Sequence, residues 1–288
     1  MHINPLSNMN IVTVLLSTYN GERYIREQIN SVLNQEGVSV NLIVRDDGSA
    51  DGTIDILKQY QDKGLLNWYT GENLRPLGSF MHLLFNCATS DYYAFCDQDD
   101  VWLPNKLLMS VQKMKQIEAR FCGKPVLIHT DMYVVDSTLN VMNRSFWDFN
   151  GIRPDILNNF VDLSCFNGVN GCTILMNNNA RNVIQSNYFP QKHFIHDVMC
   201  TLLVAGNNGI IDYVDEPTMY YRQHDNNVVG AVSHSISYYL KRLKSMPSII
   251  KDNIDAFRII NNIQHVSVWA FAFHKVRYIF IKKQGIKI

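Results

Sequence analysis

The sequence has no closely spaced pair of cysteines and no glycine-rich phosphate loop. The missing loop argues against a P-loop or a dinucleotide-binding fold. The cysteines lack a C-x-x-C pair or any short spacing suited to zinc, which is typical of reduced, mostly buried thiols in a cytosol. They stand far apart, at Cys87, Cys96, Cys122, Cys165, Cys172 and Cys200.

Export signals and long apolar runs are missing as well. No basic segment followed by an apolar one and a small-residue cleavage site opens the chain, so we expect a cytoplasmic protein. The apolar stretch 266–281 is interrupted by His274, Lys275 and Arg277. Since a spanning helix needs roughly 20 apolar residues, this stretch is expected to lie on a membrane rather than cross it.

The 288-residue chain has a net charge of zero that conceals an asymmetry. Residues 235–288 carry ten basic and two acidic residues, a charge of +8, and the preceding part carries −8. We expect a globular unit over 1–232 and a helical appendage over 233–288. The appendage either binds anionic lipid at the inner face of the cell membrane or a charged partner, or packs on the main unit with its lysines in water. Nucleic acid is not expected, because no stacking-platform motif accompanies the charges.

Strand-like and helix-like patterns alternate through the first hundred residues. Continuous apolar runs indicate buried strands, and apolar residues at helical spacing indicate the helices between them. This alternation predicts an α/β fold with a mostly parallel sheet flanked by helices, and ligands beyond the carboxyl ends of the strands. The expected strands are 11–16, 40–44, 66–70 and 92–96, and the expected helices are 24–33, 54–60 and 79–88.

An acidic cluster, Asp97-Gln98-Asp99-Asp100, directly follows the last of these strands. If the extended chain continues, Asp97 and Asp99 point to the same side. Like charges at such close range need a cation, and Mg²⁺ or Mn²⁺ accept carboxylate ligands and commonly bring a phosphate-bearing substrate. The alternative is a solvated acidic turn before a helix that has Pro104 in its first turn.

Two more polar clusters, 17–22 and 46–49, follow the first two strands. Asp47, Gly48 and Ser49 have a local explanation as a tight turn and helix cap. Beside a second carboxylate cluster, Asp47 could instead accept the imide N–H of uracil or thymine, with the glycine allowing the base to approach.

Segments 14–21, 46–53 and 97–107, in this order and spacing, resemble family 2 glycosyltransferases of the GT-A fold. The resemblance extends over 11–230. It implies a nucleotide pocket lined by Thr18, Tyr19 and Glu22, pyrimidine recognition by Asp47, a ribose or metal contact by Asp97, and a Mg²⁺ or Mn²⁺ ion held by Asp99.

The later segments are similar to the rhamnosyltransferase-like branch of this family. Residues 166–173 resemble the loop and strand that shape the acceptor side, and His196-Asp197 and 212–230 resemble the branch's later motifs. A tryptophan often follows the histidine-aspartate pair, where this chain has Val198. The branch implies a dTDP-L-rhamnose donor, with a UDP-hexose as the next candidate. The implied acceptor is a glycan or lipid-linked glycan hydroxyl, in the synthesis of a bacterial cell-surface polysaccharide.

Asp197 is the candidate general base for this transfer. A carboxylate that opens a helix over 198–205 can face a cleft, although a plain helix cap explains the position equally well. One displacement with one base implies inversion at the anomeric carbon. The resemblance also implies that Arg222 or His224 contacts the diphosphate or completes the metal shell, and Arg75 is a further candidate for a phosphate contact.

Two other function classes share these features. A sugar-phosphate nucleotidyltransferase also places carboxylates, a metal and a nucleotide at strand ends, but it releases pyrophosphate. A catalytically silent scaffold with this fold would bind a nucleotide without turnover. The number of carboxylate clusters makes the scaffold the weaker hypothesis.

Overall fold

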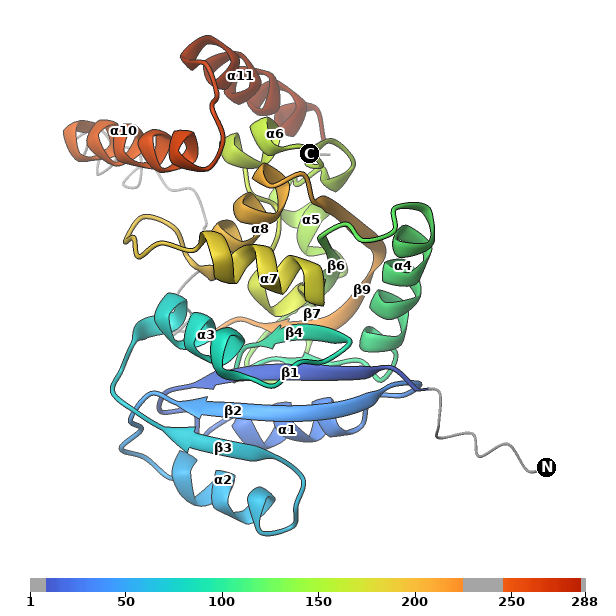
Figure 1. Cartoon of the computed structure of the whole chain (residues 1–288). Helices are drawn as coiled ribbons and strands as arrows, with labels where there is room; N and C mark the ends of the chain where they lie inside the picture. The colour runs from blue at the N-terminus through green and yellow to red at the C-terminus, as the bar shows by residue number, and fades with distance from the viewer. Residues whose placement is uncertain (1–8, 225–245, 286–288) are drawn as a thin grey trace.

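The computed structural model describes residues 9–224 and 246–285, and its nine described strands form one mixed sheet (Figure 1). The strand order is β3-β2-β1-β4-β8-β6-β9-β5, with β7 paired to β6. The strands are β1 (Ile11–Thr18), β2 (Ser39–Asp46), β3 (Asn67–Thr70), β4 (Tyr92–Cys96), β5 (Val101–Trp102), β6 (Val126–Val135), β7 (Val141–Asn143), β8 (Leu175–Asn177) and β9 (Ile210–Arg222).

The first four strands run parallel, so their carboxyl ends meet at one edge. β1 pairs with β2 and β4, and β2 pairs with β3, all in parallel. β8 then joins β4 to β6 with antiparallel pairing on both sides, and β6 and β9 are parallel again. These strands confirm the α/β prediction for the first hundred residues.

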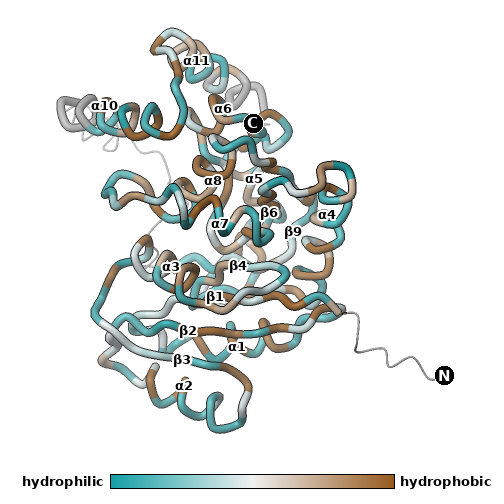
Figure 2. The backbone as a smooth tube through the Cα atoms, in the orientation of Figure 1, coloured by the Kyte–Doolittle hydropathy of each residue, from teal (hydrophilic) through white to brown (hydrophobic). Residues whose placement is uncertain are grey.

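Helices cover both faces of the sheet, and two buried apolar clusters fill the layers. Val12, Val14 and Leu16 of β1 join the cluster under α1, α2 and α4, and Leu15 joins the one under α3, α7 and α8. Figure 2 shows apolar stretches along β1 and β2. The helices are α1 (Ile25–Leu33), α2 (Thr53–Gln61), α3 (Arg75–Asn86), α4 (Lys106–Arg120), α5 (Phe146–Asn150), α6 (Phe160–Cys165), α7 (Asn178–Asn187), α8 (His196–Gly206), α10 (Met246–Ile263) and α11 (Val268–Gly285), with short 3-10 turns η2 (Pro154–Ile156) and η3 (Gly171–Thr173).

Helix α3 begins at Arg75, four residues before the predicted start at Ser79. Pro76 stands in its first turn, where the fixed φ of proline fits a helix and its missing N–H costs nothing. Arg75 is the first residue of this helix, although its φ of 60° lies in the left-handed region. Its side chain is exposed.

The C-terminal helices α10 and α11 pack on the main unit. Packing of this kind was one of the two expectations for the appendage. Ile260, Val266 and Tyr278 are buried in the same apolar cluster as α8. The expected boundary at 232/233 lies outside the described residues. No helix in the described ranges is both long and apolar enough to cross a membrane.

Candidate active site

The loops that follow β1 and β2 are tied together by hydrogen bonds. Asn20 N–H donates to Ser49 Oγ at 2.8 Å, and Ala50 N–H donates back to Asn20 Oδ1 at 2.9 Å. Glu22 Oε2 accepts from Gly52 N–H at 2.9 Å. These bonds hold the first two polar clusters as one surface at the carboxyl edge of the sheet.

Gln98 connects this surface to the acidic cluster after β4. Its Oε1 atom accepts from Thr18 Oγ1 at 2.6 Å and from Tyr19 N–H at 2.9 Å. Thr18 is buried, and Tyr19 is 49% exposed. The three predicted strand-end clusters therefore form one site, although a direct role for Thr18 would require it to leave Gln98.

Asp47 is buried, and both of its carboxylate oxygens already interact with other residues of the protein. Oδ2 accepts from Leu74 N–H at 3.1 Å, and Oδ1 pairs with the Arg45 guanidinium. The neighbouring Asp46 holds the turn, because its Oδ2 accepts from the Gly48 and Ser49 N–H groups at 3.0 Å each. Pyrimidine recognition by Asp47 stays a prediction, and it requires a base to compete with Leu74 or Arg45.

The acidic cluster does not keep the strand alternation predicted for it. β4 ends at Cys96, and the chain bends over the next residues. The side chain of Asp97 lies with Asp100 and Cys172, whose ligand-type atoms all fall within 4.8 Å of one another. Asp99 instead reaches His224, with 2.9 Å between its Oδ2 and the ring Nε2. We predicted that Asp97 and Asp99 share one side because the extended chain continues past the strand. That premise was wrong, because β4 ends at Cys96.

Burial at this cluster changes the acidity of its carboxyl groups. Desolvation raises the pKa of Asp97 to about 7, and the nearby charges of Asp99 and Asp197 add to that rise. Desolvation also raises the pKa of Asp100 well above its ordinary value, with further increases from Asp99 and Asp97. A solvated acidic turn would show neither effect, so the structure favours a cation-binding site over a solvated turn.

The residues of this cluster fit a hard divalent ion through oxygen. Asp100 Oδ2 is buried and has no hydrogen-bond partner among the described residues. The Cys172 thiol is a poor ligand for Mg²⁺, and burial raises its pKa well above the ordinary value, so it stays protonated. Asp97 and Asp100 are therefore the carboxylates of this cluster that could hold Mg²⁺ or Mn²⁺. A metal contact by Asp99 and His224, which lie against each other, stays a prediction.

Lys106 lies beneath the cluster in the first turn of α4. Its side chain is buried, with Nζ 4.9 Å from the centre of the Trp102 ring. Burial lowers its pKa to about 8, while the nearby Asp100 opposes that change. Neither Lys106 nor Cys172 was predicted as a site residue, because a lysine in a helix and an isolated cysteine carry no local signal of this site.

Arg222, at the end of β9, is engaged by the protein. Its Nε donates to Asp99 O at 2.8 Å, Nη1 to Ser137 O at 2.7 Å, and Nη2 to Glu27 Oε2 at 2.5 Å. Its backbone N–H donates to Asp100 Oδ1 at 3.1 Å. Arg222 therefore fixes the bend that carries Asp99 and Asp100, and the predicted diphosphate contact stays a prediction.

Asp197 lies in the first turn of α8 and faces the start of η3. Its Oδ2 accepts from Gly171 N–H at 3.2 Å, and its Oδ1 accepts from Val198 N–H at 2.5 Å. The capping position of α8 belongs to Ile195, so a plain cap does not account for this carboxylate. Burial raises its pKa to about 7, although the two backbone donors lower it. Gly171 directly precedes Cys172, whose Sγ lies with Asp97 and Asp100, so Asp197 lies next to the same acidic cluster.

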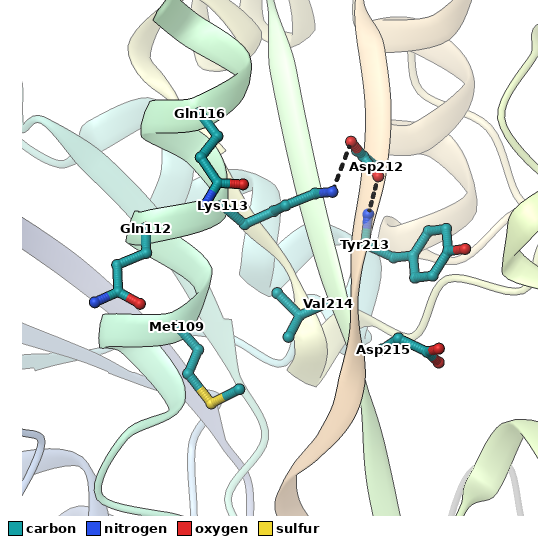
Figure 3. Close-up of a pocket in the computed structure, with 8 residues that line it drawn as sticks. All are labelled: Met109, Gln112, Lys113, Gln116, Asp212, Tyr213, Val214 and Asp215. Atoms are coloured by element: carbon teal, nitrogen blue, oxygen red, sulfur yellow. Dashed lines mark hydrogen bonds and ion pairs between the residues drawn. The ribbon is translucent and has the colours of Figure 1, made fainter.

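A separate surface hollow of about 460 Å³ lies between α4 and β9, and none of the predicted site residues lines it (Figure 3). An ion pair between Lys113 and Asp212, 3.1 Å long, crosses it. The hollow is lined by Met109, Gln112, Lys113, Gln116, Asp212, Tyr213, Val214 and Asp215. It holds none of the buried carboxylates, and we place the candidate active site at the acidic cluster.

Comparison with known proteins identifies the family of the chain. The chain is similar to a dTDP-rhamnosyl transferase, RfbG of Shigella flexneri, with 26% identity over 79% of this chain and 78% of the relative. It is also 26% identical to the uncharacterized glycosyltransferase alr2836 of Nostoc sp., over 77% of this chain and 68% of the relative.

Solved structures share the fold at low identity. S. aureus TarS 1-349 in complex with UDP-GlcNAc is 17% identical, with a TM-score of 0.54 over 96% of this chain and 81% of the other. The mannosyltransferase PcManGT from Pyrobaculum calidifontis, in complex with GDP-Man and Mn²⁺, is 15% identical, with a TM-score of 0.52 over 98% and 77% of the two chains. The model of glycosyl transferase family 2 matches residues 13–173, more than half of the sequence. The protein therefore belongs to glycosyl transferase family 2.

Proposed function

We propose that this glycosyltransferase moves a sugar from a nucleoside diphosphate to a glycan hydroxyl with inversion of the anomeric carbon. The observation that carries the proposal is the Asp197 carboxylate, which the Gly171 N–H holds beside the acidic cluster at the carboxyl edge of the sheet. A single displacement needs a cluster of carboxylates that binds the donor and a general base, and both lie at the same edge of the sheet.

The donor side is formed by the tied loops after β1 and β2. Tyr19 and Glu22 are exposed there, and Gln98 joins this surface to Asp97 and Asp99. A Mg²⁺ or Mn²⁺ ion held by Asp97, Asp99 and His224 would supply positive charge opposite the leaving diphosphate. Without a cation, the clustered carboxylates would repel that diphosphate.

Asp197 acts on the acceptor side. The acceptor oxygen attacks the anomeric carbon, the bond from that carbon to the diphosphate oxygen breaks, and the hydroxyl proton passes to the Asp197 carboxylate. With its pKa raised to about 7, this carboxylate accepts a proton more readily than an exposed aspartate does. One displacement at one face inverts the anomeric configuration.

The donor we propose first is dTDP-L-rhamnose, since the chain matches the Shigella dTDP-rhamnosyl transferase over most of both lengths. UDP-hexoses are the second candidates, and the TarS complex with UDP-GlcNAc supports them only through the shared fold. We place the reaction in the cytoplasm, with a glycan or lipid-linked glycan as acceptor. Cell-surface polysaccharide synthesis is the corresponding process.

The products of the reaction test this proposal. We would incubate the protein with dTDP-rhamnose or UDP-hexoses, Mn²⁺ and glycan acceptors, and identify the released nucleotide. A nucleoside diphosphate with an inverted glycoside supports the proposal. Release of pyrophosphate from a nucleoside triphosphate and a sugar phosphate would instead show a nucleotidyltransferase, and binding without turnover would show a scaffold.

A further inference from the structure

Helix α11 exposes an apolar stripe that the proposed reaction does not use. Trp269 is 86% exposed, Phe273 67%, Val276 53% and Phe280 64%. Their spacing of four, three and four residues places all of them on one side of an α-helix. Large aromatic side chains in such a row are unusual on a surface that contacts only water.

The opposite side of α11 is already occupied by the protein. Tyr278 stacks on Phe166 with ring centres 4.0 Å apart, and His274 Nδ1 lies 2.5 Å from Asp162 Oδ1 of α6. Cys165 Sγ contacts Phe271 O at 3.4 Å. These contacts show that α11 already packs its inner side against the protein. Its outward apolar stripe is therefore a surface feature and not a misplaced core face.

The stripe also lies at an outer end of the molecule. α11 and α10 stand at the end opposite β3 and α2 (Figure 1). Figure 2 shows apolar and hydrophilic residues mixed along α11. A helix in this position can meet a flat surface without interference from the sheet.

The charge of the segment indicates what that surface is. Residues 235–288 carry ten basic and two acidic residues, and Lys282 and Lys283 stand in the last turns of α11. A second copy would bring the same positive charge against the first, whereas anionic lipid headgroups attract it. Trp and Phe rings are suited to the boundary between headgroups and acyl chains.

We propose that α11 docks the enzyme on an anionic phospholipid bilayer through Trp269, Phe273, Val276 and Phe280. The docked helix contacts α6, and Phe166 then leads into the loop whose Gly171 holds Asp197. The bilayer then lies against the outer side of α11, at the end of the molecule opposite β3 and α2 (Figure 1). The docking itself does not depend on which sugar is transferred.

Vesicle sedimentation tests the docking directly. The full chain is mixed with vesicles of phosphatidylcholine alone, or of equal parts phosphatidylcholine and phosphatidylglycerol. We expect sedimentation with the anionic vesicles, and roughly a tenfold or greater loss of vesicle affinity in the double variant Trp269→Ser, Phe273→Ser. The matched control is Phe121→Ser, Phe149→Ser, which removes two exposed phenylalanines (43% and 49% exposed) outside α11 and is expected to bind as the parent protein does.

Tryptophan fluorescence provides a second readout. Trp269 is exposed, Trp102 and Trp147 are buried, and Trp68 is half-buried in β3, at the other end of the molecule (Figure 1). Vesicle binding is therefore expected to shift the emission to shorter wavelength, and Trp269→Phe is expected to abolish that shift. The proposal is overturned if the parent protein ignores anionic vesicles, or if the double variant binds them equally well. It is also overturned if sedimentation equilibrium shows that the double substitution dissociates a dimer while no lipid is bound.

Discussion

The ring Nε2 of His224 lies 2.9 Å from Oδ2 of Asp99, across 125 positions of sequence. Tyr24 stacks on the His224 ring with centres 5.1 Å apart, which fixes the orientation of the imidazole. The contact joins the segment after β9 to the bend after β4. It brings together the two residues that were predicted separately as metal ligands.

Replacement of His224 by alanine is therefore expected to weaken Mn²⁺ binding. Loss of a ligand, or of a residue that orients one, typically lowers metal affinity about 10–100-fold. Titration of Mn²⁺ followed by electron paramagnetic resonance measures the change. His193→Ala, which removes a histidine from the segment before α8, serves as the control, and equal Mn²⁺ affinity in the two variants would contradict the role of His224.

Asp197→Asn is expected to lower kcat while the KM for the donor stays near the parent value. The amide keeps the shape of the side chain but cannot accept the acceptor's proton, and general base catalysis is typically worth about 10²–10⁴ in rate. Steady-state kinetics with saturating donor measure the loss. Asp212→Asn, in the hollow between α4 and β9, is the matched control, and a kcat for Asp197→Asn as high as that of the control would exclude the base role.

The pH dependence of kcat follows from the raised pKa of Asp197. Burial raises that pKa to about 7, and the carboxylate is the active form. Below pH 7 the protonated fraction grows, so kcat is expected to fall about tenfold per pH unit and to level off above pH 7. Asp97, with its pKa also raised to about 7, acts in the same direction, so the profile reports the coupled pair. A kcat that is flat from pH 5 to pH 8 would contradict this assignment.

Gly171→Ala is expected to lower kcat through the position of Asp197. A Cβ at this residue would collide with the His196 imidazole, which is buried and stacked on Phe80 with ring centres 4.1 Å apart. The Gly171 N–H that holds Asp197 must then move, and overpacking of this kind typically costs about 1–3 kcal/mol of stability.

The control is Gly206→Ala, which meets Ile263 and Phe160 at the other end of α8. It is expected to destabilise the protein comparably, as measured by urea unfolding, but to leave kcat unchanged in the folded enzyme. If both variants lose kcat alike, the effect belongs to stability and not to the Gly171 contact.

The buried strands were predictable from the sequence because their apolar runs are continuous. Val12 to Leu16 and Tyr92 to Cys96 face helices on both sides, so apolar residues dominate both runs. Thr13 is a buried polar exception, and its hydroxyl accepts from Asn41 Nδ2. The start of α3 was placed too late, because Leu77 and Gly78 gave no clear helical pattern before Ser79.

The finer geometry of the site was beyond local patterns. Strand alternation cannot show that the chain bends after Cys96, and Arg222 fixes that bend through a contact to Asp99 O across 123 positions. The bond from Gly171 to Asp197 likewise depends on how the start of η3 packs against α8. Such tertiary contacts decide which residues a carboxylate contacts, and residue types alone cannot predict those contacts.

Isothermal titration of the protein with thymidine diphosphate and uridine diphosphate, each with and without Mn²⁺, tests the central claim most directly. The account predicts binding that requires Mn²⁺ and is lost in Asp99→Asn, since the clustered carboxylates repel a diphosphate until a cation lies between them. Failure of both nucleotides to bind in the presence of Mn²⁺, or binding of equal strength without any divalent ion, would contradict it.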